Sequence, residues 1–212
     1  MSLFRLDASI RLDGSHSREV ADIVEREWRA AHPGEQVVTR NIGLEPLPSD
    51  AWANAVGAGA TPESERTPAQ REAVALAAEI TSELLDADAL LFAVPLYNFG
   101  VSQHFKAWVD LVFTDPRMAP GTEPALAGKP GVLVTVRGGN YSPGTPREGW
   151  DHAIGWIERI LVDNWRVDLS VVTKEFTLVG VNPALDQFKD AAAELHAEAE
   201  NVARQHGKVL AG

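Results

Sequence analysis

The fold is decided by an unbroken apolar stretch, Ala89-Leu90-Leu91-Phe92-Ala93-Val94, which Pro95 ends. Its apolar residues are continuous instead of alternating, which is typical of a parallel strand buried on both faces. A second stretch of this kind is Gly131-Val132-Leu133-Val134-Thr135-Val136. Parallel strands need crossover connections, and these place helices on the faces of the sheet. The two stretches therefore predict an α/β protein.

Outward from these stretches, strand-like and helical patterns alternate along the chain. Further strands are expected at 3–7, at 36–40 and within an extended segment at 167–179. Helices are expected at 18–31, 67–85, 101–113, 149–162 and 183–206. The segment 41–67 is too long for an ordinary connection, so we expect short helical pieces or a mobile segment there. The alternation predicts one domain, residues 1–212, with a doubly wound five-stranded parallel sheet and helices on both faces.

Composition excludes several classes of protein. A hydrophobic fraction of 45% in 212 residues argues against disorder, and the net charge of −11 disfavours binding to nucleic acid or to an anionic membrane. The absence of cysteine excludes disulfides and thiol nucleophiles and fits a cytoplasmic protein. No apolar run is long enough to span a membrane. The histidines lack paired metal-ligand spacing, and we expect His32, His196 and His206 on helix surfaces and no metal site.

Ligands of doubly wound sheets bind beyond the carboxyl ends of the strands, so the loops there carry the functional information. The first such loop, 9–17, contains Ser9, Gly14, Ser15 and Ser17 and enters a predicted helix. Free N–H groups and the dipole of a helix N-terminus favour a phosphate, to which the hydroxyl groups can also donate. The loop is neither a dinucleotide-binding glycine motif nor a P-loop. The alternative is that Ser17 only caps the helix.

The second loop, 95–100, combines Tyr97, Asn98 and Phe99 with a glycine at the end of a buried strand. Aromatic rings and an amide suit a flat heterocycle with polar edges. The alternative is that Tyr97 and Phe99 are core residues beneath the next helix.

The third loop, 137–141, contains the pair Gly138 and Gly139, which allows backbone amides to approach a ligand closely. The alternative is an ordinary turn between a strand and a helix. All three loops share the edge at which this architecture binds ligands, which favours a functional interpretation of the set.

These residues resemble motifs of the FMN-dependent NADH azoreductase family, a branch of the flavodoxin-like NAD(P)H:quinone reductases. The similar elements are Pro95-Leu96-Tyr97-Asn98-Phe99 with Phe105-Lys106-Ala107-Trp108-Val109-Asp110, Ser9 with Ser15-His16-Ser17, and Arg137-Gly138-Gly139. The resemblance implies a flavodoxin-like fold and a homodimer. It also implies FMN as cofactor, NADH or NADPH as electron donor and a flat aromatic acceptor such as a quinone or an azo compound.

The resemblance also implies where FMN would bind. The phosphate would contact Ser9, Ser15, His16 and Ser17, and the ring would rest against Leu96, Tyr97, Asn98 and Phe99. The turn Val136-Arg137-Gly138-Gly139 would follow the pyrimidine edge of the ring, with backbone amides facing it. Because the cofactor performs the redox chemistry, no side chain is expected to act as an acid–base catalyst. Tyr141 and His152 are candidates for contacts with the acceptor.

The sequence departs from the family pattern at three places. Val136 stands where the family often has serine, the segment 113–127 looks short and lacks a covering aromatic pair, and Asp163-Asn164-Trp165 replaces a small turn. These departures predict a retained flavin site with an altered acceptor site. Two alternatives remain open: a one-electron carrier like a flavodoxin, and a dedicated flavin reductase in a biosynthetic pathway.

Overall fold

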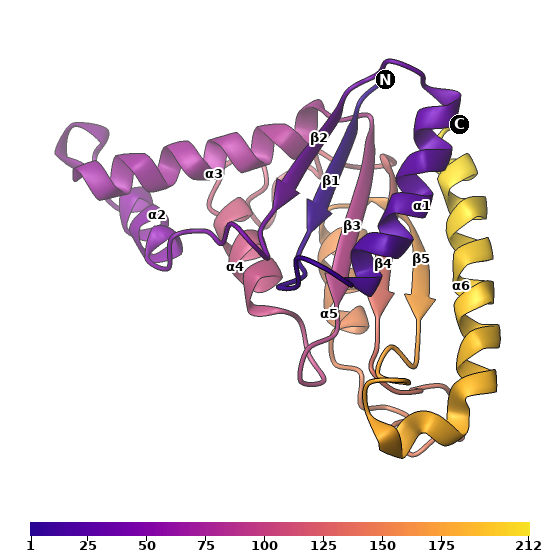
Figure 1. Ribbon diagram of the computed structural model, residues 1–212. Coiled ribbons are helices and arrows are strands. Elements are labelled where there is room, and N and C mark those ends of the chain that lie inside the picture. The colour runs from indigo at the N-terminus through magenta and orange to yellow at the C-terminus, as the bar shows by residue number, and fades with distance from the viewer.

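The computed structural model describes residues 1–212, and its centre is a parallel sheet with the strand order β2-β1-β3-β4-β5 (Figure 1). The strands are β1 (Leu3–Asp7), β2 (Val37–Asn41), β3 (Ala89–Pro95), β4 (Pro130–Val136) and β5 (Asp168–Lys174). All neighbouring strands are parallel, so their carboxyl ends share one edge. The predicted α/β class and doubly wound five-stranded sheet are confirmed.

Helices cover both faces of the sheet. On one face, α1 (His16–Ala31) packs beside α6 (Lys189–Leu210) and against β3 and β4. The other helices are α2 (Ala51–Gly59), α3 (Pro68–Asp86), α4 (Gln103–Val112) and α5 (Ile154–Glu158). They contribute to a separate apolar core, so the sheet lies between two layers of side chains.

The two cores follow from the alternation of side chains along the strands. Leu3 and Leu91 belong to the core beneath α1 and α6, which also contains the fully buried Trp28. Phe4 and Phe92 face the opposite core and pack against Trp108, whose ring lies 6.3 Å from that of Phe4. Trp28 and Trp108 are therefore packing residues.

The segment 41–67, for which short helical pieces or a mobile segment were expected, contains two short helices. They are α2 and the 3₁₀ helix Glu63–Glu65. Helices α2 and α3 lie side by side and extend away from the sheet (Figure 1). Helix α3 begins with Thr67 as its N-cap, in a reciprocal capping box with Gln70. Trp52 on α2 is 53% exposed. None of the helices combines the length and the apolar character that a membrane span requires.

The helix expected at 183–206 begins as a 3₁₀ helix, Pro183–Phe188, and its α-helical part, α6, starts at Lys189 and ends at Leu210. Two further sequence-predicted boundaries were wrong. The helix expected at 149–162 begins only at Ile154, because Asp151 Oδ1 accepts hydrogen bonds from the N–H groups of Ala153 and Ile154 and so starts the helix there. It continues as a π-helix, Arg159–Asn164. Beyond it, the N–H of Trp165 donates to the carbonyl of Ile160.

The extended segment expected at 167–179 was the second error. Strand β5 ends at Lys174, and Phe176 has a φ of 56°, which turns the chain out of the strand. The following residues then pair with the loop after β4 instead of continuing along the sheet. This pairing brings a fourth segment to the carboxyl edge.

Candidate functional site

The three predicted loops meet at the carboxyl edge of the sheet around a cavity of about 250 Å³. The lining residues from these loops are Ser9, Arg11, Gly14, Ser15, His16, Ser17, Pro95, Leu96, Tyr97, Val136 and Gly138. The fourth segment adds Thr177 and Leu178. Eight of the twelve positions proposed for the cofactor therefore lie together here. The other four, Asn98, Phe99, Arg137 and Gly139, do not line this cavity.

The N-terminus of α1 forms one end of the cavity. Ser15 is the N-cap residue, and its side chain makes no capping hydrogen bond. The first intrahelical bond runs from Glu19 N–H to Ser15 C=O, so the N–H groups of His16, Ser17 and Arg18 precede it without an acceptor in the chain. These free donors and the helix dipole make a binding site for an anion.

Ser17 lies in the first helical turn and is only 1% exposed. The alternative in which Ser17 caps the helix was wrong, because the cap position belongs to Ser15. The hydroxyl oxygens of Ser15 and Ser17 are 3.3 Å apart. The two hydroxyl groups therefore face the same small volume as the free N–H groups.

Tyr97 joins the first loop to the second. Its hydroxyl oxygen accepts a hydrogen bond from Ile10 N–H at 3.2 Å and lies 3.5 Å from Ser9 Oγ. Ser9 Oγ in turn accepts from Arg11 N–H at 3.3 Å. Tyr97 lines the cavity and is not part of the core beneath α4, so the packing alternative for this residue was wrong.

The second loop makes a tight turn beyond β3. Tyr97 and Gly100 exchange two backbone hydrogen bonds of 3.2 and 3.0 Å, and the residues between them, Asn98 and Phe99, have φ values of 49° and 67°. Positive φ is uncommon outside glycine and costs energy at a bulky residue such as Phe99. Asn98 lines a second hollow of about 560 Å³, which shares Tyr97 with the first cavity. Phe99 lines neither and is 40% exposed.

Arg137 turns its side chain to a buried ion-pair cluster instead of the first cavity. The guanidinium lies 2.8 Å from Asp151 and 2.8 Å from Glu175. Glu175 also accepts hydrogen bonds from Tyr141 N–H and the Ser142 hydroxyl. The cluster fixes the third loop relative to the segment after β5, and Tyr141 is held within it at 8% exposure.

The fourth segment packs directly on the paired glycines. The N–H of Leu178 donates to Gly138 C=O, and the N–H of Phe176 donates to Gly139 C=O. A Cβ at Gly138 would lie 2.7 Å from Leu178 Cδ1, so a side chain at this position would require Leu178 to shift. The N–H groups of Gly138 and Gly139 have no acceptor within the chain, and of the two residues Gly138 lines the cavity.

Gly14 and Pro95 were named in the sequence only as members of their loops, and Arg11, Thr177 and Leu178 were missed. Arg11 could have been found, because it is a cation in a loop assigned to a phosphate, and it is the only lysine or arginine that lines the cavity. Thr177 and Leu178 gave no signal, since they looked like the continuation of a strand.

His152 lies at the surface beside the second loop. Its N–H donates to Phe99 C=O at 2.9 Å, which ties the loop after β3 to the segment before α5. Trp150, which is 50% exposed, packs edge-on against Phe99 with 5.5 Å between the ring centroids. Neither His152 nor Trp150 lines the cavity, so an acceptor contact for His152 stays a prediction.

His196, which was expected on a helix surface, lies on α6 and is half-buried near His16. Its Nε2 lies 2.7 Å from Glu175 C=O, and its ring lies 6.4 Å from that of His16. Burial lowers the pKa of His196, and the nearby Lys174 and His16 act in the same direction, while the contact with Glu175 C=O offsets part of this shift.

Two sequence departures assigned to the acceptor side lie elsewhere. The segment 113–127 precedes β4, and Trp165 precedes β5, so both belong to the amino edge of the sheet. Trp165 is buried against Trp108 and Phe113. Within one chain, these departures therefore leave the cavity unchanged.

The sequence of this chain is similar to that of known proteins over nearly its whole length. A family model described as "Flavodoxin-like fold" matches residues 1–202. A protein of Frankia alni named FMN-dependent NADH:quinone oxidoreductase is 40% identical over 205 residues, covering 96% of this chain and 97% of its own. A protein of Streptomyces coelicolor with the same name is 34% identical, covering 96% and 94%.

Solved structures share the fold. An azoreductase from Bacillus anthracis str. Sterne superposes with a TM-score of 0.80 at 21% identity, covering 99% of each chain. An FMN-dependent NADH-azoreductase from B. anthracis str. Ames Ancestor in complex with FMN gives 0.68 at 15% identity, covering 96% of this chain and all of that one.

Proposed function

This chain belongs to the flavodoxin-like family, and from that membership we propose that it is an FMN-dependent oxidoreductase. It passes two electrons from NADH or NADPH to a flat acceptor such as a quinone or an azo compound. Relatives that align over nearly their whole length carry the name FMN-dependent NADH:quinone oxidoreductase. The observation that carries the proposal is the cavity, which joins an anion site to a turn rich in aromatic residues.

The phosphate end of the cavity fits a phosphomonoester. Three free N–H groups at the start of α1, the hydroxyl groups of Ser15 and Ser17, and the cation of Arg11 surround one volume. A neutral ligand would leave these donors without a charged acceptor. We therefore assign the phosphate of FMN to Ser9, Arg11, Ser15, His16 and Ser17.

The other end of the cavity fits a flat ring. Leu96, Tyr97 and Val136 provide apolar contact, and the N–H group of Gly138 is free to donate to a ring edge. Bound FMN supplies hydride transfer from the nicotinamide and then to the acceptor. The chain's part is to bind, orient and stabilise charge with fixed donors, and no side chain is assigned to proton transfer.

The test of the proposal is a pair of fluorescence titrations with FMN and with riboflavin. We expect FMN to bind at least about tenfold more tightly, because riboflavin lacks the charged phosphate that accepts these hydrogen bonds. Equal affinities would remove the phosphate assignment. Rapid bleaching of the bound flavin by NADH without a separate reductase is the outcome expected of an enzyme, and its absence would favour a one-electron carrier.

We also propose that the protein is a homodimer. The support is a set of exposed aromatic side chains, Phe99 and Trp150 beside the site and Trp52 on α2. Exposed apolar groups of this size are commoner at interaction surfaces than elsewhere. Light scattering at micromolar concentration should give twice the chain mass of 22.9 kDa, and a value at the chain mass would contradict the proposal.

A further inference from the structure

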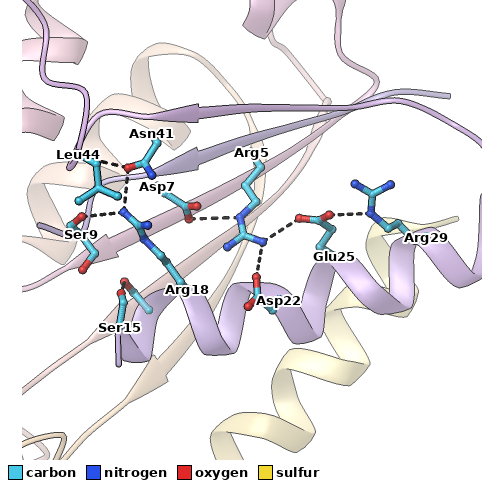
Figure 2. Close-up of polar contacts among 11 residues, drawn as sticks. Arg5, Asp7, Ser9, Ser15, Arg18, Asp22, Glu25, Arg29, Asn41 and Leu44 are labelled. Carbon is cyan, nitrogen blue, oxygen red and sulfur yellow. Dashed lines mark hydrogen bonds and ion pairs between the residues drawn. The ribbon is translucent and has the colours of Figure 1, made fainter. Parts of the chain in front are cut away.

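Arg18 occupies a position that electrostatics alone disfavours. It is the third residue of α1, where the helix dipole repels a cation. Its Nε is buried and has no hydrogen-bond partner. A cation at a helix N-terminus and a buried N–H group without an acceptor are both unfavourable, so a compensating interaction is expected nearby. Figure 2 shows that the Arg18 side chain reaches away from α1 toward the ends of β1 and β2.

The compensating interactions are two hydrogen bonds from one guanidinium nitrogen. Arg18 Nη2 donates to Ser9 C=O and to Asn41 Oδ1, both at 2.8 Å (Figure 2). Asn41 Oδ1 also accepts from Leu44 N–H at 3.2 Å. Arg18 therefore connects three elements: the start of α1, the loop after β1 and the last residue of β2.

The loops after β1 and β2 are already in close backbone contact. Gly43 N–H donates to Asp7 C=O at 3.2 Å, and a Cβ at Gly43 would lie only 2.0 Å from Ser9 C=O. Arg18 closes this contact from the helix side. The carbonyl of Ser9 is thus fixed on one side of the loop, while the Ser9 hydroxyl is turned to Tyr97 and the cavity.

We infer that Arg18 is a positioning residue, which holds Ser9 and the loop after it in the shape that receives the phosphate, without touching the phosphate itself. This inference rests on the proposed function. Holding the loop before the ligand arrives reduces the ordering that binding must otherwise impose, and such preorganisation increases affinity. We expect the larger effect on the phosphate, because Arg18 bonds Ser9 C=O directly, whereas the ring end contacts this loop through the Tyr97 hydroxyl group.

The competing explanation is that Arg18 acts only through its charge, by attracting the phosphate over a distance. Lysine separates the two explanations, because it keeps the charge but lacks the planar guanidinium that spans two acceptors. The experiment measures the FMN and riboflavin affinities of the full chain and of Arg18→Met, Arg18→Lys and Asn41→Ala. The matched control is Arg29→Met, since Arg29 lies on the same helix and pairs only with Glu25.

We expect Arg18→Met to weaken FMN about tenfold or more and riboflavin by less than about threefold. Arg18→Lys should recover little of the loss, Asn41→Ala should shift affinity in the same direction by a smaller factor, and Arg29→Met should change neither ligand. An unchanged FMN-to-riboflavin ratio in Arg18→Met and Asn41→Ala would overturn the inference, as would full recovery in Arg18→Lys. Failure of the unmodified protein to prefer FMN would instead contradict the proposed function.

Discussion

The two ends of the cavity are built in opposite ways. At the phosphate end, Ser15 and Ser17 are buried. The loop there is held by a hydrogen bond from Arg18 to Ser9 C=O and by one from Ile10 N–H to the Tyr97 hydroxyl oxygen. Beside the ring end, Phe99 has a strained backbone, and its side chain is exposed together with that of Trp150, although neither lines the cavity. This difference indicates that the phosphate end is preformed within one chain, as suits a cofactor that stays bound. The ring end is left exposed, as suits an electron donor and an acceptor that must bind and dissociate in turn.

The largest effect is expected at Gly43, where a substitution would disrupt the phosphate end and remove the difference between the two ends. Gly43→Val places a side chain in contact with the Ser9 carbonyl, which leaves too little room for both loops. We expect FMN binding to fall by more than about 100-fold and stability to fall by roughly 2–4 kcal/mol. Titration and urea denaturation measure the two losses.

The control for Gly43 is Gly155→Ala on α5, where an added Cβ has no neighbour within 4 Å. It should leave FMN binding unchanged. If Gly43→Val keeps normal FMN affinity, the contact between the two loops does not maintain the phosphate end.

Ser17→Ala tests the phosphate end without disturbing its backbone. Since Ser17 is not the helix cap, its hydroxyl is free to donate to a charged phosphate, a bond worth roughly 1.5–3 kcal/mol. We expect FMN to bind about 10- to 150-fold more weakly and riboflavin to bind as before. Parallel loss of both ligands would show that the substitution acts on the whole cavity.

Trp150→Ala tests the ring end. Aromatic pairs of this geometry contribute about 0.5–1.5 kcal/mol, so we expect the KM for a small quinone to rise about two- to twelvefold while the FMN Kd stays within twofold. Trp52→Ala is the matched control, since Trp52 is similarly exposed but lies on α2. A KM change in both variants would point to assembly, which light scattering would detect.

The smallest effect concerns pH. Burial lowers the pKa of His196, so the folded state favours the neutral ring. The stability that this group contributes is present above about pH 6.5, the usual histidine value, and is lost as the pH falls through the lower folded-state pKa. The melting temperature should therefore drop less between pH 7.5 and 5.5 in His196→Gln than in the unmodified protein. Equal drops would remove His196 as the cause.

The sequence predicted those parts of the molecule that depend on local pattern. Continuous apolar runs located β3 and β4, and hydroxyl groups before an amphipathic stretch located the start of α1. It failed where tertiary contacts override pattern. The residues around Phe176 give no indication of its positive φ. The residues around Arg137 likewise do not indicate that its ion-pair partners are Asp151 and Glu175.

For the site as well, the parts that depend on local sequence were predicted and the parts that depend on tertiary contacts were not. Serine hydroxyls and loop glycines act through backbone geometry at a strand end, so motif spacing located them correctly around the cavity. The acceptor side depends on which loops reach which edge of the sheet. Trp165 was assigned to the acceptor side from its position in the sequence alone. That position does not reveal that the residue lies at the amino edge of the sheet, before β5.

The π-helix Arg159–Asn164 has a consequence for how chains of this kind vary in length. A helical turn with a hydrogen bond across five residues, as between Trp165 and Ile160, accommodates one residue more than an α-helical turn. Insertion or deletion of a single residue can therefore be absorbed here before β5 starts, with the register of the sheet preserved. A shorter relative would rotate the residue after the helix by about 100°, away from Trp108 and Phe113. The tryptophan and the extra residue are thus expected to be gained or lost together.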